Sequence, residues 1–498
     1  FFFKPKTAYE ISLGLVGSEM CIRDSSSTDQ LQELPMTSTQ QQTRSSENVE
    51  QFDAIIIGAG VTGLYALYRL RQLGFSARSF EEGSGVGGTW YWNRYPGCRF
   101  DSESYTYGYS FSEELLQEWD WKEHYSAQPE NERYLNYVAD KFDLRQDIRL
   151  NSRVMSAVFD ENANQWEVLI EDGHRARGQF LITSVGILSA GYVPEFDGKD
   201  TFEGFSCHTG RWPKEGVDLA GKRVGVIGTG ASGVQLITEI AKEVSQLTVF
   251  QRTANFCAPL RNSLIDDETQ KSIKSSYPEI FRKCMETAGS FVHEFDPRSA
   301  MSVSPEERLE KYESLWQESG FKKWLSNFYD VMLPGEANED YAEFFRNKIR
   351  ERVNDPDVAE MLVPKGHMFG SKRLPCESGY YEVYNQDNVL LVDVKSAPIE
   401  RITPNGIKTK DAEYELDVII FATGFDAVTG SLSRLHIEGE GGQTLSDKFS
   451  NGPRTFMGVQ SAGFPNLFTI NQASVGNFVR ACLLYTSDAA DEGLGVDL

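Results

Sequence analysis

The chain alternates short apolar runs with segments whose apolar residues recur at helical spacing. Residues 53–57 are apolar and β-branched, as is typical of a strand buried in a parallel sheet, and residues 222–227 predict a second such strand. Helical patterns follow at 62–73 and 232–243. This repeated order of strand, turn and helix predicts an α/β fold with two Rossmann-like dinucleotide-binding domains.

Each turn between strand and helix carries glycines at G-x-G-x-x-G spacing. The first set is Gly58, Gly60 and Gly63, and the second set is Gly228, Gly230 and Gly233. Glycines at these places allow a tight turn, a close approach of the backbone to a pyrophosphate, and tight packing of helix on strand. The helix N-terminus behind each turn offers free N–H groups to a diphosphate.

The residues that end the following strands differ between the two sites. The strand that ends at Phe80 is followed by Glu81, which suits ribose hydroxyls. The strand at 247–250 is followed by Gln251, Arg252 and Thr253, and an arginine with a hydroxyl favours a 2′-phosphate. We therefore expect FAD at the first site and NADPH at the second. The alternative for Arg252 is an ordinary surface cation.

Two further strand ends suggest how the domains are joined. The segment 417–426 contains a strand that ends in Ala422-Thr423-Gly424, where the chain can pass close to a cofactor, and 180–186 predicts the matching strand end in the first half. We expect an FAD domain at 52–195 and 390–481, interrupted by an NADPH domain at 196–389. Residues 262–350 have helical spacing and many aromatics, which predicts a helical insertion with the aromatics in its core.

Both ends of the chain differ from its middle. Residues 1–51 lack the periodicity of a packed element, and from Ser25 to Gln51 the chain is rich in Ser, Thr and Gln, which predicts disorder. Residues 482–498 are acidic and non-periodic. The segments GLVGSEMCIRDS and CLLYTSDAADE resemble translated adapter sequence, so we expect both ends to be foreign and the native C-terminus to be missing.

Composition narrows the class of protein. The net charge of −24 argues against a nucleic-acid or anionic-membrane partner, and no apolar run approaches the ~18 residues of a membrane span. The seven cysteines are scattered without a C-x-x-C pair, which favours reduced thiols in the cytoplasm and argues against a zinc site. We expect no metal. Oligomeric state is not readable from the sequence.

Two longer motifs point to a family. Residues 202–213 fit F-x-G-x-x-x-H-x-x-x-W-P, through Phe202, Gly204, His208, Trp212 and Pro213. Residues 87–101 fit G-G-x-W, four residues, Y-P-G, three residues and Asp. Over about 52–470 the chain resembles type I Baeyer–Villiger monooxygenases, most closely the phenylacetone and steroid monooxygenase branch. Related N- and S-oxygenating flavin monooxygenases usually lack the Trp-Pro ending.

The resemblance implies further cofactor contacts. For FAD it adds Gly88, Thr89, Trp90, Asp101, Tyr107 and Val154, and for NADPH it adds Arg99, Thr229, Ser232 and Lys372. Taken alone, Trp90 is more typical of a core residue, and Lys372 of a loop cation. In this family the fingerprint histidine lies on the linker between domains, so we interpret His208 as a hydrogen-bonded linker residue and not as a base.

The resemblance also implies the reaction. NADPH would reduce FAD, O2 would form a C4a-peroxyflavin, and a ketone would become an ester or lactone. Arg373 would lie over the flavin and Asp101 would orient it. A guanidinium suits this role because it supplies positive charge without giving up a proton. The alternatives are an N- or S-oxygenating flavin monooxygenase and an inactive, truncated nucleotide-binding protein.

Overall fold

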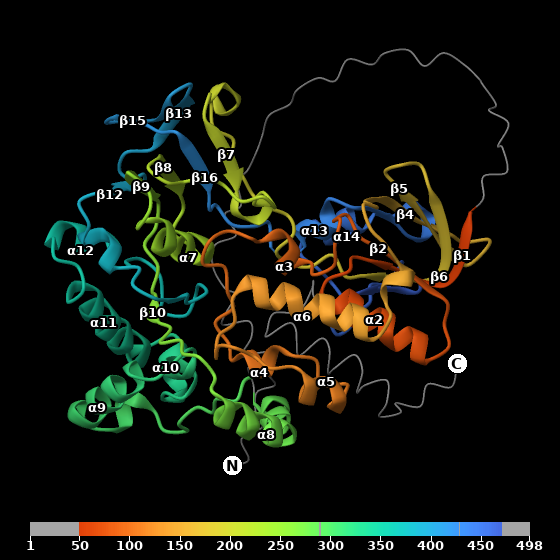
Figure 1. Cartoon of the computed structure of the whole chain (residues 1–498), viewed down its shortest axis with the longest axis horizontal. Helices are drawn as coiled ribbons and strands as arrows, with labels where there is room; N and C mark the ends of the chain where they lie inside the picture. Colours follow the sequence, from red (N-terminus) through yellow and green to blue (C-terminus); the bar gives the residue numbers. More distant parts are fainter. Residues whose placement is uncertain (1–48, 288–289, 428, 471–498) are drawn as a thin grey trace.

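The computed structural model describes residues 49–287, 290–427 and 429–470. The expected foreign segment 482–498 and nearly all of the expected tail 1–51 lie outside the described residues. Figure 1 shows two sheets in separate lobes, with a group of helices below the second sheet. The fold class expected from the sequence, mixed α/β with two glycine-motif domains, is confirmed.

The first sheet has eight strands in the order β17-β4-β5-β6-β1-β2-β3, with β18 beside β6. Strands β1, β2, β3, β6 and β18 pair in parallel, and β4, β5 and β6 form an antiparallel meander. The bounds are β1 Glu50–Ile57, β2 Ala77–Phe80, β3 Ile148–Arg149, β4 Val154–Asp160, β5 Gln165–Ile170, β6 Arg175–Thr183, β17 His436–Glu438 and β18 Leu467–Thr469.

The second sheet has five parallel strands in the order β12-β9-β8-β16-β7. Their bounds are β7 Phe205–His208, β8 Arg223–Ile227, β9 Gln246–Gln251, β12 Val389–Asp393 and β16 Val418–Phe421. Two small sheets accompany it, namely β10 Ala258–Pro259 with β11 Cys376–Glu377, and an antiparallel sheet of β13 Ile399–Thr403, β14 Gly406–Thr409 and β15 Glu413–Glu415.

The expected return of the chain to the first domain at residue 390 is wrong. Strands β12 and β16 both belong to the second sheet, and the chain re-enters the first sheet only at β17, beside β4. The physical reason is that β16 completes the second sheet between β8 and β7. The turn after β16 therefore backs the second glycine motif, in the same way that the turn after β6 backs the first.

The helices fall into three groups. Helix α2 (Val61–Gln72) follows β1, and α7 (Ala231–Ile240) follows β8. Near the first sheet lie α3 Thr89–Trp92, α4 Ser104–Tyr107, α5 Glu113–Glu118, α6 Gln128–Lys141, α13 Gly430–Ser433 and α14 Leu445–Phe449. The helical insertion holds α8 Asp267–Glu286, α9 Pro305–Trp316, α10 Lys322–Leu325, α11 Glu336–Arg350 and α12 Pro356–Leu362.

Short 3₁₀ turns connect several of these elements. They span Arg145–Asp147, Lys199–Thr201, Thr209–Arg211, Ala300–Ser302, Tyr329–Met332, Glu382–Asn385 and Glu440–Gly442. The helical insertion runs somewhat further than the expected 262–350, because α12 extends it to Leu362. Its aromatics pack together in a buried cluster with Phe256 and Tyr125, so their expected role as core is confirmed.

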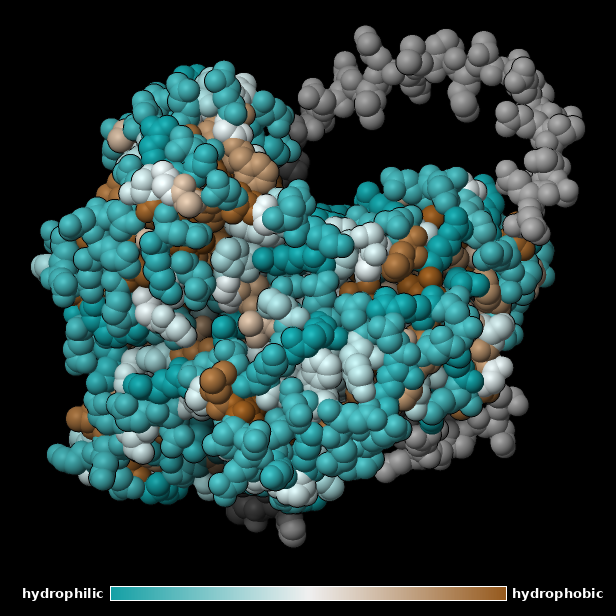
Figure 2. Space-filling model, in the orientation of Figure 1, coloured by the Kyte–Doolittle hydropathy of each residue, from teal (hydrophilic) through white to brown (hydrophobic). Residues whose placement is uncertain are grey.

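The described residues contain no helix long and apolar enough to cross a membrane. Figure 2 shows a face that is mostly hydrophilic, with apolar residues in small, separate patches. Five cysteines of the described ranges are free thiols, namely Cys98, Cys207, Cys257, Cys284 and Cys376.

Candidate functional site

The first glycine motif is a tightly packed turn between β1 and α2. Gly58 has a φ of +103°, and a Cβ there would meet the carbonyl oxygen of Ser184 at 2.6 Å. A Cβ on Gly63 would lie 2.0 Å from the Gly58 carbonyl oxygen. Gly60 faces Gly88, whose own Cβ would lie 2.9 Å from the Gly60 Cα. Only glycines allow these backbones to approach one another so closely.

Glu81 lies directly behind this turn. Its carboxylate accepts hydrogen bonds from the backbone N–H groups of Ala59 and Gly83, both at 2.8 Å. The residue is 5% exposed, and burial raises the pKa of this carboxyl, while the two backbone donors act against that increase. One of these donors belongs to the glycine turn, so the acid that follows β2 is fixed against the motif.

The second signature segment packs beside the same turn. Thr89 begins α3, and Trp90 is buried, with its Nε1 donating to the Tyr107 hydroxyl at 2.8 Å. Trp90 also meets Phe100 edge-on, with ring centroids 5.7 Å apart. Trp90 therefore belongs to the core of this lobe. Val154 begins β4 and is also buried, as part of the core on the other face of the sheet.

The second glycine motif repeats the geometry of the first. Gly228 has a φ of +108°, and a Cβ there would meet the Ala422 carbonyl oxygen at 2.5 Å. A Cβ on Gly233 would lie 2.3 Å from the Gly228 carbonyl oxygen. A Cβ on Gly230 would have no neighbour within 4 Å, so the space in front of this turn is open. Thr229 closes the turn by donating from its hydroxyl to the Thr253 carbonyl at 3.1 Å.

The residues expected to recognise the 2′-phosphate have different surroundings. Gln251 is buried, and its Nε2 donates to the Met361 carbonyl at 2.8 Å, which directs it toward α12. Arg252 is exposed at the end of β9, while Thr253 and Lys372 are half-buried. The strand end thus presents a cation to solvent beside the open second turn.

Asp101 and Arg373 come together from distant parts of the chain. The Arg373 Nη2 donates to the Asp101 Oδ2 at 2.9 Å, and the Cys376 backbone N–H donates to the same oxygen at 3.4 Å. Asp101 is 1% exposed, whereas the Arg373 side chain is about half exposed, at 52%. Partial burial opposes the charge on Arg373, but pairing with Asp101 outweighs it and raises the pKa of the guanidinium. The result is a permanently charged group held at one end and open at the other.

His208 is held at both ring nitrogens. Its Nδ1 accepts from the Gly210 backbone N–H at 3.0 Å, which leaves Nε2 to donate to the Gly424 carbonyl at 2.9 Å. Burial lowers the pKa of this imidazole, which favours the neutral form. The ring therefore joins the end of β7 to the turn after β16, and the interpretation of His208 as a linker residue agrees with these contacts.

The rest of the linker fingerprint is structural in its contacts. Gly204 lies where a Cβ would meet both the Asp417 carbonyl oxygen and the Phe202 ring at 2.5 Å. Trp212 is buried, and Pro213 follows it at the surface of the same core. The neighbouring Arg211 lies over the Trp92 ring at 3.9 Å, so the two signature segments touch.

Gln235 of α7 joins the two lobes, and the sequence did not point to it. It accepts from the Tyr95 hydroxyl at 2.8 Å and donates from Nε2 to the Arg99 carbonyl at 3.0 Å. Arg99 itself pairs with Glu123, at 3.2 Å. A polar residue on the buried face of an otherwise apolar helix was the signal that could have identified Gln235.

Arg373 has a second anchor that the sequence did not reveal. The Asn255 side-chain Nδ2 donates to the Arg373 carbonyl at 2.9 Å. Asn255 comes from the loop after β9, so this contact fixes the backbone of Arg373 to the second lobe while Asp101 fixes its guanidinium to the first. No sequence spacing connects these residues.

The arrangement of the two turns fits two dinucleotides. Helices α5, α8, α9 and α12 begin at Ser or Asp side chains that accept from their own first turn. By contrast, α2 and α7 begin at Gly60 and Gly230, with no side-chain cap and no acidic residue in the first turn. Their N–H groups are thus available to phosphate oxygens.

No cluster of metal-binding side chains occurs in the described ranges.

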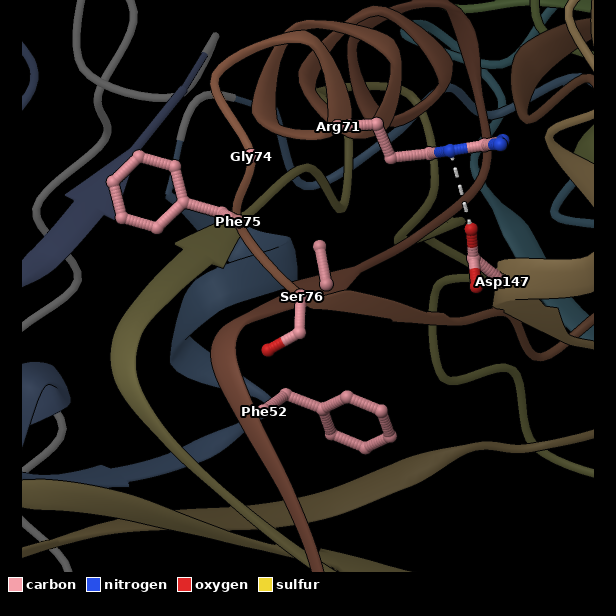
Figure 3. A pocket seen from close by; sticks show the side chains of 7 residues that line it. Phe52, Arg71, Gly74, Phe75, Ser76 and Asp147 are labelled. Carbon is pink, nitrogen blue, oxygen red and sulfur yellow. Dashed lines mark ion pairs between the residues drawn. The ribbon is translucent and has the colours of Figure 1, made fainter.

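A surface pocket of about 320 Å³ lies elsewhere. Figure 3 shows its lining of Phe52, Arg71, Gly74, Phe75, Ser76 and Asp147, with Arg71 and Asp147 paired at 3.5 Å. Phe52 stands near the start of β1 and Phe75 before the start of β2, at the amino-terminal edge of the first sheet. The glycine turns follow the carboxyl ends of their strands, so this pocket is separate from the candidate site.

Several known proteins are similar to this chain in sequence and fold. Residues 53–261 match the flavin-binding monooxygenase-like family. A 2-oxo-Delta(3)-4,5,5-trimethylcyclopentenylacetyl-CoA monooxygenase of Pseudomonas putida is 49% identical over 84% of this chain and 78% of its own length. A Baeyer-Villiger monooxygenase of Pseudooceanicola batsensis is 45% identical over 86% of this chain and 79% of its own length.

A solved structure and a relative of different chemistry complete the comparison. The crystal structure of OTEMO in complex with FAD and NADP matches with a TM-score of 0.86 at 47% identity, and the match covers 89% of this chain and 86% of that one. A phenazine N-monooxygenase of Lysobacter antibioticus is 42% identical over 84% of this chain and 77% of its own length. The family match over residues 53–261 includes both glycine motifs and both signature segments. The chain therefore belongs to the flavin-binding monooxygenases, within their Baeyer–Villiger group.

Proposed function

We propose that this protein is an FAD- and NADPH-dependent monooxygenase that converts a ketone into an ester or lactone. One oxygen atom of O2 enters the C–C bond beside the carbonyl, the other leaves as water, and NADPH supplies the two electrons. The observation that carries the proposal is the Asp101–Arg373 pair, a charged guanidinium held on a buried carboxylate.

The first glycine turn suits FAD. Gly58, Gly60 and Gly63 would receive the pyrophosphate against the N-terminus of α2, and Glu81 has lone pairs left for ribose hydroxyls beyond its two backbone donors. Gly88 lies against Gly60 and Thr89 follows it in the chain, so the backbone of both would border the same ligand. Buried Trp90 and half-buried Tyr107, joined by a hydrogen bond, would support this wall through packing, and buried Val154 would support the sheet from its other face.

The second glycine turn suits NADPH. Its open space in front of Gly230 would take the pyrophosphate, with Thr229, Ser232 and Gly233 around it. Exposed Arg252, with Thr253 and Lys372, would bind the 2′-phosphate, which favours charge-assisted hydrogen bonds. Gln251 and Arg99 would act by fixing the surrounding loops, since their side chains already bond to protein groups.

The chemistry of the residues follows from fixed charge. When bound, the flavin would supply activated oxygen and the nicotinamide the reducing electrons. Arg373 would stabilise negative charge on the reacting oxygen atoms, including the former carbonyl oxygen of the ketone. Its raised pKa means that it would not protonate them. Asp101 would hold the guanidinium in one orientation, which removes the cost of reorganisation during reaction.

His208 would not be the base of this reaction. Both ring nitrogens already bond to backbone groups, and burial lowers the pKa of the imidazole. Its place between β7 and the turn after β16 instead suits coupling of the linker to the second lobe.

We also propose a cytoplasmic location, supported by the free thiols of the described residues.

The proposal is tested by incubating the FAD-loaded protein with NADPH, ¹⁸O2 and a panel of linear and cyclic ketones. The expected result is an ester or lactone carrying one ¹⁸O atom in its ring or bridging position. Omitting NADPH should abolish the product. Oxidation of amines or sulfides with no ester from any ketone would contradict it.

An N-oxygenase is the second candidate, favoured by the phenazine N-monooxygenase among the relatives. The same panel should therefore include a phenazine and a tertiary amine. Higher kcat/KM for these nitrogens than for every ketone would favour this second function. The Asp101–Arg373 pair favours the first, because a fixed cation stabilises anionic oxygen that attacks an electrophilic carbon.

A further inference from the structure

Glu103 is a buried carboxylate close to the candidate site, and the proposed reaction does not use it. It is 4% exposed and is separated from Asp101 only by Ser102. Its Oε1 lies 2.8 Å from the Nε2 of His293, whose side chain is 8% exposed. Its Oε2 has no hydrogen-bond partner in the described part of the chain. A carboxylate buried with so few partners is costly, so its presence calls for a role beyond packing.

The contacts of Glu103 cross the boundary between the first lobe and the helical insertion. His293 lies in the loop after α8, and the Tyr125 hydroxyl, 3.4 Å from Glu103 Oε1, lies 2.9 Å from Ser319 Oγ before α10. One loop of the insertion thus contacts the carboxylate directly through His293, and a second loop reaches it through Tyr125. Figure 1 shows α4, which Glu103 precedes, lying beside α8.

The backbone around Glu103 is also fixed. The Glu103 carbonyl accepts from both the backbone N–H and the hydroxyl of Thr106, at 2.9 and 2.8 Å. Next to it, the Ser104 N–H donates to the His124 carbonyl at 2.7 Å. With its side chain held by the insertion and its backbone held by α4, Glu103 has little freedom, and neither has Asp101 on the same short segment.

We propose that Glu103 is a positioning residue for the Asp101–Arg373 pair, and that His293 makes this positioning depend on docking of the helical insertion. The predicted effect on catalysis rests on the proposed function, whereas the predicted effect on the structure does not. Loss of the Glu103 contact would let the 101–103 segment shift, and Asp101 would carry the Arg373 guanidinium and the Cys376 N–H contact with it. A displacement of about 1 Å in a reacting group typically costs up to ~100-fold in rate.

The first measurement is independent of any reaction. Hydrogen exchange of the Cys376 backbone amide is compared in wild type, Glu103→Ala and Glu103→Gln, without substrate. We expect about tenfold faster exchange in Glu103→Ala and near wild-type exchange in Glu103→Gln, which keeps an oxygen beside His293. The control is Glu130→Ala, which removes another buried carboxylate, one bonded to the Ser126 hydroxyl at 3.0 Å and remote in sequence from Asp101.

The second measurement is the yield of ester per NADPH oxidised, with kcat and KM for the ketone. Glu103→Ala should lose about tenfold or more in coupling and kcat with little change in KM, while Glu103→Gln and Glu130→Ala stay within about threefold of wild type. His293→Ala should follow Glu103→Ala. Equal losses in Glu130→Ala, no rescue by Glu103→Gln, or wild-type Cys376 protection in Glu103→Ala would overturn the proposal. Absence of ester from wild type itself would count against the proposed function alone.

Discussion

The Asp101 carboxylate lies 2.9 Å from the Arg373 guanidinium, although 272 positions separate the two residues in the chain. Asp101 comes from the loop beside the first sheet, and Arg373 from the loop before β11, where Asn255 fixes its backbone. The cation therefore has one buried partner and about half of its side chain left open to solvent. A group held in this way is preorganised for charge that develops during a reaction.

Arg373→Ala should bind FAD and accept electrons from NADPH normally but form ester ~10²–10³-fold more slowly, since one preorganised donor is lost. Asp101→Asn should show a smaller loss, because Arg373 keeps its charge but loses its ionic partner. Stopped-flow reduction of the flavin and ester formation should be measured on the same preparations. Ester formation at the wild-type rate in Arg373→Ala would remove this residue from the mechanism.

The two glycine motifs give a contrast between folding and cofactor binding. Gly63→Ala should yield protein with little bound flavin, because its Cβ would lie 2.0 Å from the Gly58 carbonyl oxygen. Gly230→Ala should fold and bind FAD normally, because its Cβ meets no protein atom within 4 Å. It should nevertheless raise KM for NADPH about tenfold or more, equal to ~1.4 kcal/mol, by intruding on the pyrophosphate. Flavin absorbance and steady-state kinetics distinguish the two effects, and an unchanged KM would argue against a nucleotide at the second turn.

Arg252→Ala should reduce the preference for NADPH over NADH. A charge-assisted hydrogen bond to a phosphate is worth ~1.5–3 kcal/mol, so KM for NADPH should rise roughly 10- to 100-fold, while KM for NADH stays unchanged. The matched control is Arg401→Ala, which removes another exposed cation, on β13. Equal changes for both nucleotides would show that Arg252 acts on the fold and not on the phosphate.

Lys323 should make the free energy of unfolding depend on pH. A substitution that removes its charge should abolish this dependence. It is fully buried, its Nζ donates to the Glu318 carbonyl, and burial lowers its pKa from 10.5 to about 8. Because one unit of pKa difference is worth ~1.4 kcal/mol, holding this ammonium charged costs the folded state about 3 kcal/mol below pH 8. This cost becomes smaller as pH rises from about 8 toward 10.5. In this pH range the folded protein has released the proton from Lys323, whereas the unfolded chain still binds it.

Lys323→Met should therefore stabilise the protein by ~1–3 kcal/mol at pH 7, with an advantage that shrinks above pH 8. Urea unfolding at pH 7, 8.5 and 9.5 measures it. The control is Lys322→Met, next in sequence but with a side chain 43% exposed, which should show no such trend. A difference between Lys323→Met and wild type that stays constant with pH would contradict the lowered pKa.

The sequence alone determined both glycine turns and the nucleotide expected at each. Each of these predictions depends on residues that are close together in the chain. A strand, three glycines and a helix follow one another within a few residues, and Glu81 or Arg252 comes at the end of the next strand. Gly58 and Gly63, where no space remains for a Cβ, are only five positions apart in the chain. The aromatic core of the helical insertion was equally predictable, because apolar spacing alone favours it.

Only the tertiary structure decided which sheet each returning strand joins and which distant side chains meet. Strand β16 is buried at all four positions, so its sequence carries no alternation that would assign it to either sheet, and the expected return at residue 390 was wrong for that reason. The contacts of Gln235 and Asn255 and the Glu103–His293 contact could not be predicted for a similar reason. Their partners lie on other elements, and no spacing along the chain records a contact that folding alone creates.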